Sequence, residues 1–95
     1  MPSRRKSVEG TVYLLHFDAP FKHAKHYVGW TEGPVENRLN DHRSGNGARL
    51  LAVLKQAGIG FVLARTWAGT RTLERAIKNS RHVPRYCPLC ERKGR

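Results

Sequence analysis

Arg38 and His42 stand four residues apart, a spacing that places both side chains on one face of the helix predicted for residues 35–43. A guanidinium can bind two oxygens of one phosphate group, and an imidazole can exchange a proton near neutral pH. The pair therefore indicates chemistry on a phosphate ester. Each residue also has an ordinary explanation, because solvated helix arginines and surface or capping histidines are common.

Hydrolysis of a phosphodiester needs two further groups, a carboxylate that holds a metal ion and a group that activates water. Glu74 is the best candidate for the carboxylate, since it lies at the start of the last predicted helix. His42, Tyr13 and Tyr27 are the candidates for activating water. Taken singly, Glu74 could form an exposed helix pair with Lys78, and the tyrosines could be core aromatics.

Two strands are expected upstream of this helix. Residues 11–17 form an apolar, β-rich run, and residues 26–30 form a second, shorter one. The polar segment 18–25 between them is predicted to be a hairpin loop, so the strands pair antiparallel. Gly29 lies in the second strand, where it permits a close approach or a sharp bend.

The remaining elements are mainly helical. A cap and a proline begin the helix at 35–43, and the sequence SGNG ends it. A second helix is predicted for residues 48–57, a third strand for residues 61–67, and a last helix with its cap at Thr70 or Thr72. The order β-β-α-α-β-α predicts an α+β domain with a small, three-stranded, mostly antiparallel sheet flanked by helices.

These motifs resemble those of the GIY-YIG nuclease family over residues 11–79. TVY at 11–13 resembles the first family motif, and YVG at 27–29 resembles the second. ENRLNDHRSG at 36–45 is similar to the family segment in which an arginine and then a histidine follow. TLERAIK at 72–78 resembles the segment with the metal-binding glutamate.

The resemblance implies the same element order and one site that cleaves phosphodiester bonds. Its residues would be Tyr13, Tyr27, Arg38, Glu74 and, as in the branches that use a histidine, His42. It also implies Mg²⁺ or Mn²⁺ at Glu74, since one carboxylate suits a hard, hydrated ion. Only about one part in a thousand of a free tyrosine is ionised at pH 7, so we expect Tyr13 to act with His42, which could orient it or take its proton.

Two positions depart from the family pattern. Thr11 replaces the glycine of the first motif. Many members carry an asparagine beyond the glutamate, often after a Pro-x-Tyr turn, and here VPRYC places Cys87 at that position. Asn79 is nearest but stands on the predicted helix. The expected function is a metal-dependent DNA endonuclease, and the alternative is a catalytically weak or inactive nucleic-acid-binding module of the same fold.

The charge of the chain also indicates a nucleic-acid partner. Its 95 residues include 18 Lys and Arg against 7 Asp and Glu, for a formal net charge of +11. Such a field attracts phosphate polyanions without specifying a sequence. DNA is the expected partner, with RNA left open. The expected contacts are basic residues of the helices and tail: Arg43, Arg49, Lys55, Lys78, Arg81 and Arg85.

One domain is expected at residues 10–80, between a flexible basic arm at 1–9 and a basic tail at 81–95. No apolar run is long enough for a transmembrane helix, and none follows the basic start as in a signal peptide. A cytoplasmic location without a membrane partner is therefore expected.

Cys87 and Cys90 form a Cys-x-x-Cys pair, a spacing often used for zinc. A structural zinc site needs four ligands, so His82, His23 or His26 would complete it, or a second chain would. The alternatives are two free thiols or one local disulfide. A zinc-stabilised protein–protein adaptor is thus a third function class, distinguished by a partner affinity that salt barely affects.

Overall fold

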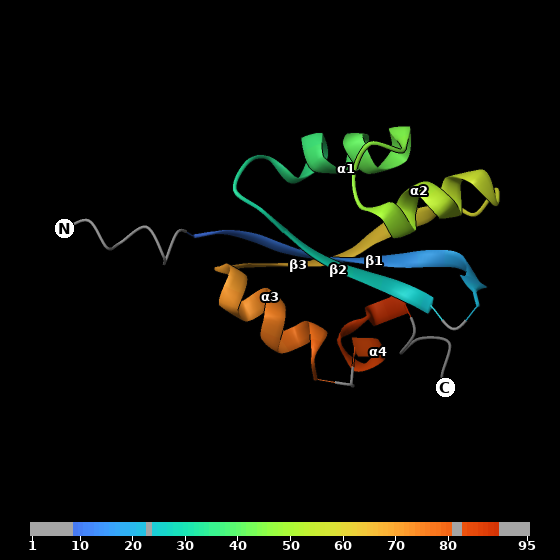
Figure 1. The fold of residues 1–95 in the computed structure, drawn as a ribbon. Coiled ribbons are helices and arrows are strands. Elements are labelled where there is room, and N and C mark those ends of the chain that lie inside the picture. Colours follow the sequence, from blue (N-terminus) through green and yellow to red (C-terminus); the bar gives the residue numbers. More distant parts are fainter. Residues whose placement is uncertain (1–8, 23, 81–82, 90–95) are drawn as a thin grey trace.

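The computed structural model describes residues 9–22, 24–80 and 83–89, and the elements follow the predicted order with one short helix added at the end (Figure 1). These elements are β1 (Gly10–Phe21), β2 (Ala24–Thr31), α1 (Val35–Ser44), α2 (Arg49–Gln56), β3 (Phe61–Gly69), α3 (Arg71–Lys78) and α4 (Val83–Tyr86). Among the helices of the described residues, none combines the length and the apolar character needed to cross a membrane.

The sheet has the strand order β2-β1-β3, and β1 pairs antiparallel with both neighbours. β1 takes the centre because its apolar run can be buried on both faces; Val12, Leu14 and Leu15 are all fully buried. The predicted α+β fold with a three-stranded antiparallel sheet and flanking helices is confirmed.

The hairpin between β1 and β2 is tighter than the sequence predicts. Most of the predicted loop, residues 18–25, lies in strand: Phe21 pairs with Ala24, and the chain reverses next to Lys22, which has φ of 58°. Residues 18–20 are exposed, so their side chains carry no apolar strand signal. Strand pairing here depends on backbone hydrogen bonds, which a polar sequence pattern does not reveal.

The helix ends follow local sequence signals. α1 starts directly after Pro34, and Gly45 ends it in the left-handed region with φ of 90°. α3 starts after Thr70, whose hydroxyl oxygen accepts a hydrogen bond from the Thr72 N–H at 3.2 Å. Of the two caps predicted for this helix, Thr70 is the one used.

Alternating residues of β1 face two separate hydrophobic cores. Tyr13, Leu15 and Phe17 pack under α1 and α2, whereas Val12 and Leu14 pack against α3 and the segment around α4. The helices therefore form two layers with the sheet between them (Figure 1). The parity of a residue in β1 decides which layer, and which polar cluster, its side chain faces.

The packed domain continues beyond residue 80. Residues 83–89, which the sequence assigns to the tail, pack on the second face of the sheet, and Cys87 is fully buried there. The predicted basic arm falls outside the described residues except for Glu9, which is exposed. Residues 81–82 and 90–95 of the predicted tail also lie outside them.

Candidate active site

Tyr13 and His42 form the centre of the candidate site. Tyr13 points from β1 toward α1, and α1 brings His42 to it, so that Tyr13 Oη and His42 Nε2 lie 2.8 Å apart. The exposed fraction is 1% for Tyr13 and 0% for His42. Titratable groups held together away from water are typical of functional sites, so this pair is the natural starting point for a mechanism.

The backbone determines where the proton of His42 lies. The N–H of Ala48 donates a hydrogen bond to His42 Nδ1 at 3.3 Å. Because an amide N–H can only donate, Nδ1 carries the lone pair, and the proton of the neutral ring is on Nε2. Nε2–H therefore donates to Tyr13 Oη. In this tautomer His42 supports the phenol oxygen and cannot accept the phenol's proton at Nε2.

Two glycines leave room for the pair. A Cβ at Gly29 would overlap the ring and hydroxyl of Tyr13, its partner across the strand pair. A Cβ at Gly47, in the loop after α1, would overlap the His42 ring. The prediction that Gly29 permits a close approach is confirmed, and the group that approaches is Tyr13. Steric space, not backbone conformation, requires glycine at both positions.

Tyr27 adds a third ring to the cluster. Its ring centroid lies 6.3 Å from that of Tyr13 and 5.5 Å from that of His42. Tyr27 is only partly buried, in contrast to the other two residues. It therefore joins the buried pair to the surface along β2.

Arg38 lies one helical turn before His42, and its side chain interacts with the hydroxyl of Tyr13. Its side chain is 38% exposed, and both its hydrogen bond and its positive charge lower the pKa of Tyr13, against the larger effect of burial. Its ion pair with Asp41 is long, at 3.7 Å, and is screened by solvent. The guanidinium is therefore able to exchange this partner for a phosphate group.

Glu74 reaches the cluster from the opposite helical layer. α3 packs against β2, an edge strand of the sheet, which brings the side chains of α3 next to Tyr27. Lys78 Nζ lies 3.1 Å from Glu74 Oε2 and 6.0 Å from the centre of the Tyr27 ring. The negative charge of Glu74 also contributes to the raised pKa of Tyr13. The five predicted site residues are thus linked through contacts and charge.

Burial determines the protonation states of the pair. It raises the pKa of Tyr13 above the ordinary value of a phenol; the hydrogen bond from Arg38 opposes this shift, and the charges of Tyr27 and Glu74 add to it. Burial also lowers the pKa of His42, and the charge of Arg38 adds to that effect. At neutral pH the site holds a neutral imidazole and a protonated phenol, so further positive charge is needed to ionise Tyr13.

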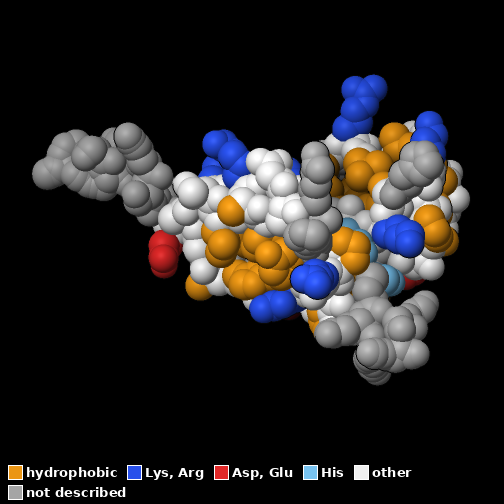
Figure 2. All heavy atoms as spheres, turned by 90° about the horizontal axis from the view of Figure 1, so that it is seen from below, with side chains coloured by type: hydrophobic (Ala, Val, Ile, Leu, Met, Phe, Trp, Pro, Cys, Tyr) orange, Lys and Arg blue, Asp and Glu red, His pale blue; other side chains and the backbone are white. Residues whose placement is uncertain are grey.

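The predicted phosphate contacts are distributed over both helical layers. Those that the structure describes are all exposed, and Arg81 lies outside the described residues. Figure 2 shows Lys and Arg side chains spread around the face that carries α3 and α4. Three residues belong to the α1–α2 layer and two to the α3–α4 layer: Arg43, Arg49 and Lys55, then Lys78 and Arg85.

A groove of about 520 Å³ runs beside Tyr27. Lys25 and Lys78 both line it, together with Pro84 of α4. Lys25 was not predicted as a contact, because the sequence places it in a loop, whereas it belongs to β2. The groove brings two cations beside the exposed edge of the aromatic cluster.

Two further arginines lie over tryptophan rings. The guanidinium carbon of Arg65 is 4.6 Å from the centre of the Trp67 ring, and that of Arg71 is 4.9 Å from that of Trp30. Both tryptophans are partly buried and pack against the second core. Arg65 was not predicted, although its spacing of two from Trp67 on a strand places both on one face.

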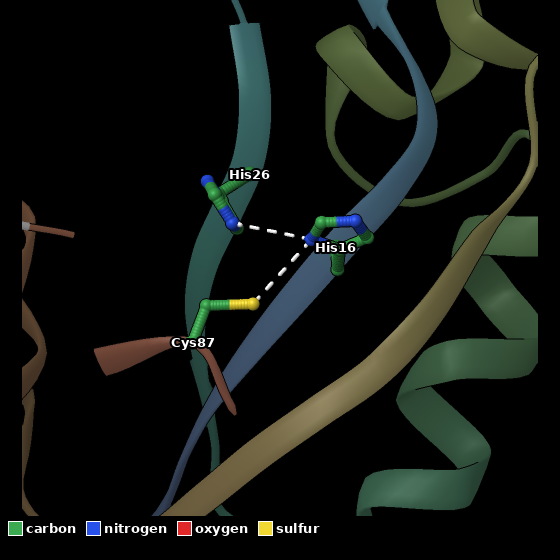
Figure 3. Close-up of side chains that lie close together, drawn as sticks. All are labelled: His16, His26 and Cys87. Carbon is green, nitrogen blue, oxygen red and sulfur yellow. Dashed lines mark hydrogen bonds between the residues drawn. The ribbon is translucent and has the colours of Figure 1, made fainter. Parts of the chain in front are cut away.

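A second polar cluster lies on the other face of the sheet (Figure 3). His16 and His26 face each other in the β1–β2 register. His16 Nδ1 lies 3.4 Å from His26 Nε2 and 3.4 Å from Cys87 Sγ. Burial, followed by the charges of His16 and Lys25, lowers the pKa of His26, so its ring is neutral at pH 7.

This cluster contains two of the residues predicted to bind zinc, Cys87 and His26. His16 was not predicted, because only the strand register places it opposite His26 and only the return of the chain after α4 brings Cys87 to it. The other predicted ligands fall outside the described residues: Cys90, His82 and His23.

Comparison of the chain with protein-family models, with curated proteins and with solved structures found no match. The resemblance to the GIY-YIG family therefore rests on the sequence motifs, and the function rests on the geometry of the residues themselves.

Proposed function

We propose that this protein is a metal-dependent endonuclease of the GIY-YIG type that hydrolyses phosphodiester bonds of DNA. The observation that carries the proposal is the buried hydrogen bond of 2.8 Å between His42 and Tyr13, with Arg38 acting on the same phenol. The net charge of +11 supports a polyanionic substrate. A reducing cytoplasm is the proposed location, and it fits the free thiol of Cys87.

Arg38 is proposed to bind the scissile phosphate. Its guanidinium is partly exposed, while its only ion pair among the described residues is the long contact with Asp41. A guanidinium presents paired N–H donors that match two phosphate oxygens. Charge that develops on those oxygens in the transition state strengthens the interaction, which is how such a group accelerates the reaction.

Tyr13 is proposed to activate the attacking water. Its oxygen receives hydrogen bonds from His42 Nε2–H and from Arg38, and both favour the phenolate. The phenol loses its proton to solvent when positive charge is added nearby, and the phenolate then takes a proton from water. His42 is a positioning residue in this scheme, since its Nε2 already carries a proton. Of the two roles that the sequence leaves open for His42, orientation is the one we propose.

Glu74 is the residue that would hold Mg²⁺ or Mn²⁺. Its side chain is 17% exposed, and that of its partner Lys78 is 50% exposed. One carboxylate suits an ion that keeps most of its water ligands. Such an ion, when bound, offsets the charge of Glu74 that raises the pKa of Tyr13 and stabilises negative charge on the phosphate.

A catalytically weak nucleic-acid-binding module is the second candidate, and one observation favours it. Cys87 occupies the position where the family pattern has an asparagine, and it packs with His16 on the opposite face of the sheet. It therefore offers no polar group to Tyr13. The basic surface would still bind nucleic acid in a protein of this kind.

Cleavage of supercoiled plasmid, measured beside DNA binding, tests the proposal. The wild-type protein should nick the plasmid only with Mg²⁺ or Mn²⁺, and Glu74→Gln and Arg38→Ala should each lower the rate at least about 100-fold. Glu74→Gln should retain DNA binding with its steep salt dependence, because it removes no positive charge. Glu32→Gln and Arg75→Ala are matched controls at exposed positions and should cleave at the wild-type rate.

Wild-type rates in Glu74→Gln or Arg38→Ala would contradict the proposed site. Salt-dependent DNA binding by the wild-type protein without any metal-dependent cleavage would instead favour the binding module.

A further inference from the structure

Three metal-binding donor atoms converge on the face of the sheet opposite to Tyr13. The ligand atoms of His16, His26 and Cys87 all lie within 4.8 Å of one another. They come from β1, from β2 and from the segment just after α4 (Figure 3). The contact between His16 and Cys87 joins positions that are 71 residues apart. The cluster is therefore a product of the tertiary fold.

The spacing of these atoms matches a tetrahedral zinc site on two of its edges. Zinc binds imidazole nitrogen at about 2.05 Å and thiolate sulfur at about 2.3 Å, so ligands at tetrahedral angles stand about 3.4 Å apart for two nitrogens and about 3.6 Å for nitrogen and sulfur. His16 Nδ1 lies 3.4 Å from His26 Nε2 and 3.4 Å from Cys87 Sγ. The ligand atoms of the third pair, His26 and Cys87, lie within 4.8 Å of each other.

Hydrogen bonds alone do not satisfy all three donor atoms of this cluster well. His16 Nδ1 is the atom that meets both partners, yet a ring nitrogen offers either one proton or one lone pair. A cation placed among the three atoms can bind all of them at once. Cys87 is fully buried, and a metal is a stronger partner for a buried thiolate than a neutral imidazole is.

We propose that His16, His26 and Cys87 bind one zinc ion that fastens the segment after α4 to the β1–β2 hairpin. Imidazole nitrogen and thiolate sulfur are donors that favour zinc over Mg²⁺, which prefers oxygen. Binding converts the Cys87 thiol to a thiolate and releases its proton to solvent. The three residues would supply three of the four ligands that zinc takes, and a water molecule would be the fourth. The ion would lie on the other face of the sheet from Tyr13, and the site stands independently of the nuclease proposal.

Zinc affinity of untagged protein, measured by competition with a chromophoric chelator, tests this assignment. The wild-type protein should bind about one equivalent per chain. His16→Ala, His26→Ala and Cys87→Ser should each weaken binding at least about 100-fold. His82→Ala, at the ligand position that the sequence predicts, should retain the wild-type affinity.

Cobalt substitution keeps the test decisive if a variant fails to fold. The wild-type Co²⁺ complex should show the thiolate-to-cobalt charge-transfer band and the intense visible bands of a tetrahedral ion with nitrogen and sulfur ligands. A wild-type complex without the thiolate band would overturn the proposal. Unchanged zinc affinity in His16→Ala, or loss of zinc in His82→Ala with His16→Ala unaffected, would overturn it as well.

Discussion

The two faces of β1 carry two histidine clusters that differ in how the ring nitrogens are used. On the α1 side, His42 has a backbone donor at Nδ1 and the hydroxyl of Tyr13 at Nε2. On the α3–α4 side, His16 presents one nitrogen to both His26 and Cys87. In the first cluster each nitrogen has one partner with a fixed role, whereas in the second several metal-binding atoms face one another.

This difference separates two kinds of chemistry that use the same residue type. An imidazole with a fixed tautomer can hold a phenol in place and donate to its oxygen, but it has no lone pair left for a metal. An imidazole beside a second imidazole and a thiol can share a cation with them. β1 contributes to both clusters, Tyr13 to the first and His16 to the second, because side chains at odd and even positions of a strand point to opposite faces.

Replacing the glycines that contact Tyr13 and His42 with alanine should have the largest effect on stability and cleavage. It should leave the His16–His26–Cys87 cluster unchanged. Gly29→Ala forces a Cβ into Tyr13, and Gly47→Ala forces one into His42. Overpacking of this kind costs about 1–3 kcal/mol of unfolding free energy, and displacement of the pair should also reduce DNA cleavage at least about tenfold. Urea unfolding and plasmid cleavage measure the two effects.

Gly33→Ala is the matched control, since a Cβ there meets nothing within 4 Å. It should leave stability and cleavage unchanged, and all three variants should keep the zinc affinity of the wild type. Wild-type stability and activity in both Gly29→Ala and Gly47→Ala would show that the pair is not tightly packed, and the contrast between the two faces would fail.

Acidification should lower the free energy of unfolding through protonation of His42, by less than the glycine substitutions do. Burial lowers the pKa of His42, with the charge of Arg38 adding to the shift and that of Asp41 opposing it. The unfolded chain, in which histidine titrates near about pH 6.5, therefore binds the proton more readily than the folded protein. The stabilising contribution is complete above that pH and is lost as the pH falls through the lower folded value.

Urea unfolding at about pH 7.5 and about pH 5.5, with zinc chelated, measures this effect, which is at most about 1.4 kcal/mol per pH unit for one histidine. The wild-type protein should lose more stability on acidification than His42→Gln does. Equal losses in the two proteins would mean that His42 is not held neutral by the fold.

Much of the fold is readable from local sequence patterns. The apolar run around Leu14 predicts the central strand, and the signals at Thr70 and in the loop after α1 predict helix ends that the structure confirms. The extension of the hairpin through Phe21 and the packing of Cys87 are not readable in this way. The hairpin extension depends on backbone pairing of Phe21 with Ala24, for which local hydrophobicity carries no signal. The packing of Cys87 depends on contacts with distant segments.

The candidate site also has features that the sequence predicts and features that only the tertiary structure reveals. The types of residue and the helical spacing of Arg38 and His42 are visible in the sequence, and so is the need for Gly29 to be small. The tautomer of His42 is not, because the Ala48 N–H that fixes it is positioned only by the turn after α1. The contacts of His16 are not visible in the sequence either, because strand register places His26 opposite it and the chain after α4 brings Cys87 to it.

The most direct test of the central claim is the single-turnover rate of DNA cleavage by Tyr13→Phe, which removes one oxygen from the buried pair. Tyr86→Phe, a tyrosine that packs against Trp67 in the other core, is the matched control. Tyr13→Phe should bind DNA as the wild type does and cleave it at least about 100-fold more slowly, whereas Tyr86→Phe should cleave normally. Cleavage by folded Tyr13→Phe at the wild-type rate would contradict the assignment of Tyr13 as the group that activates water.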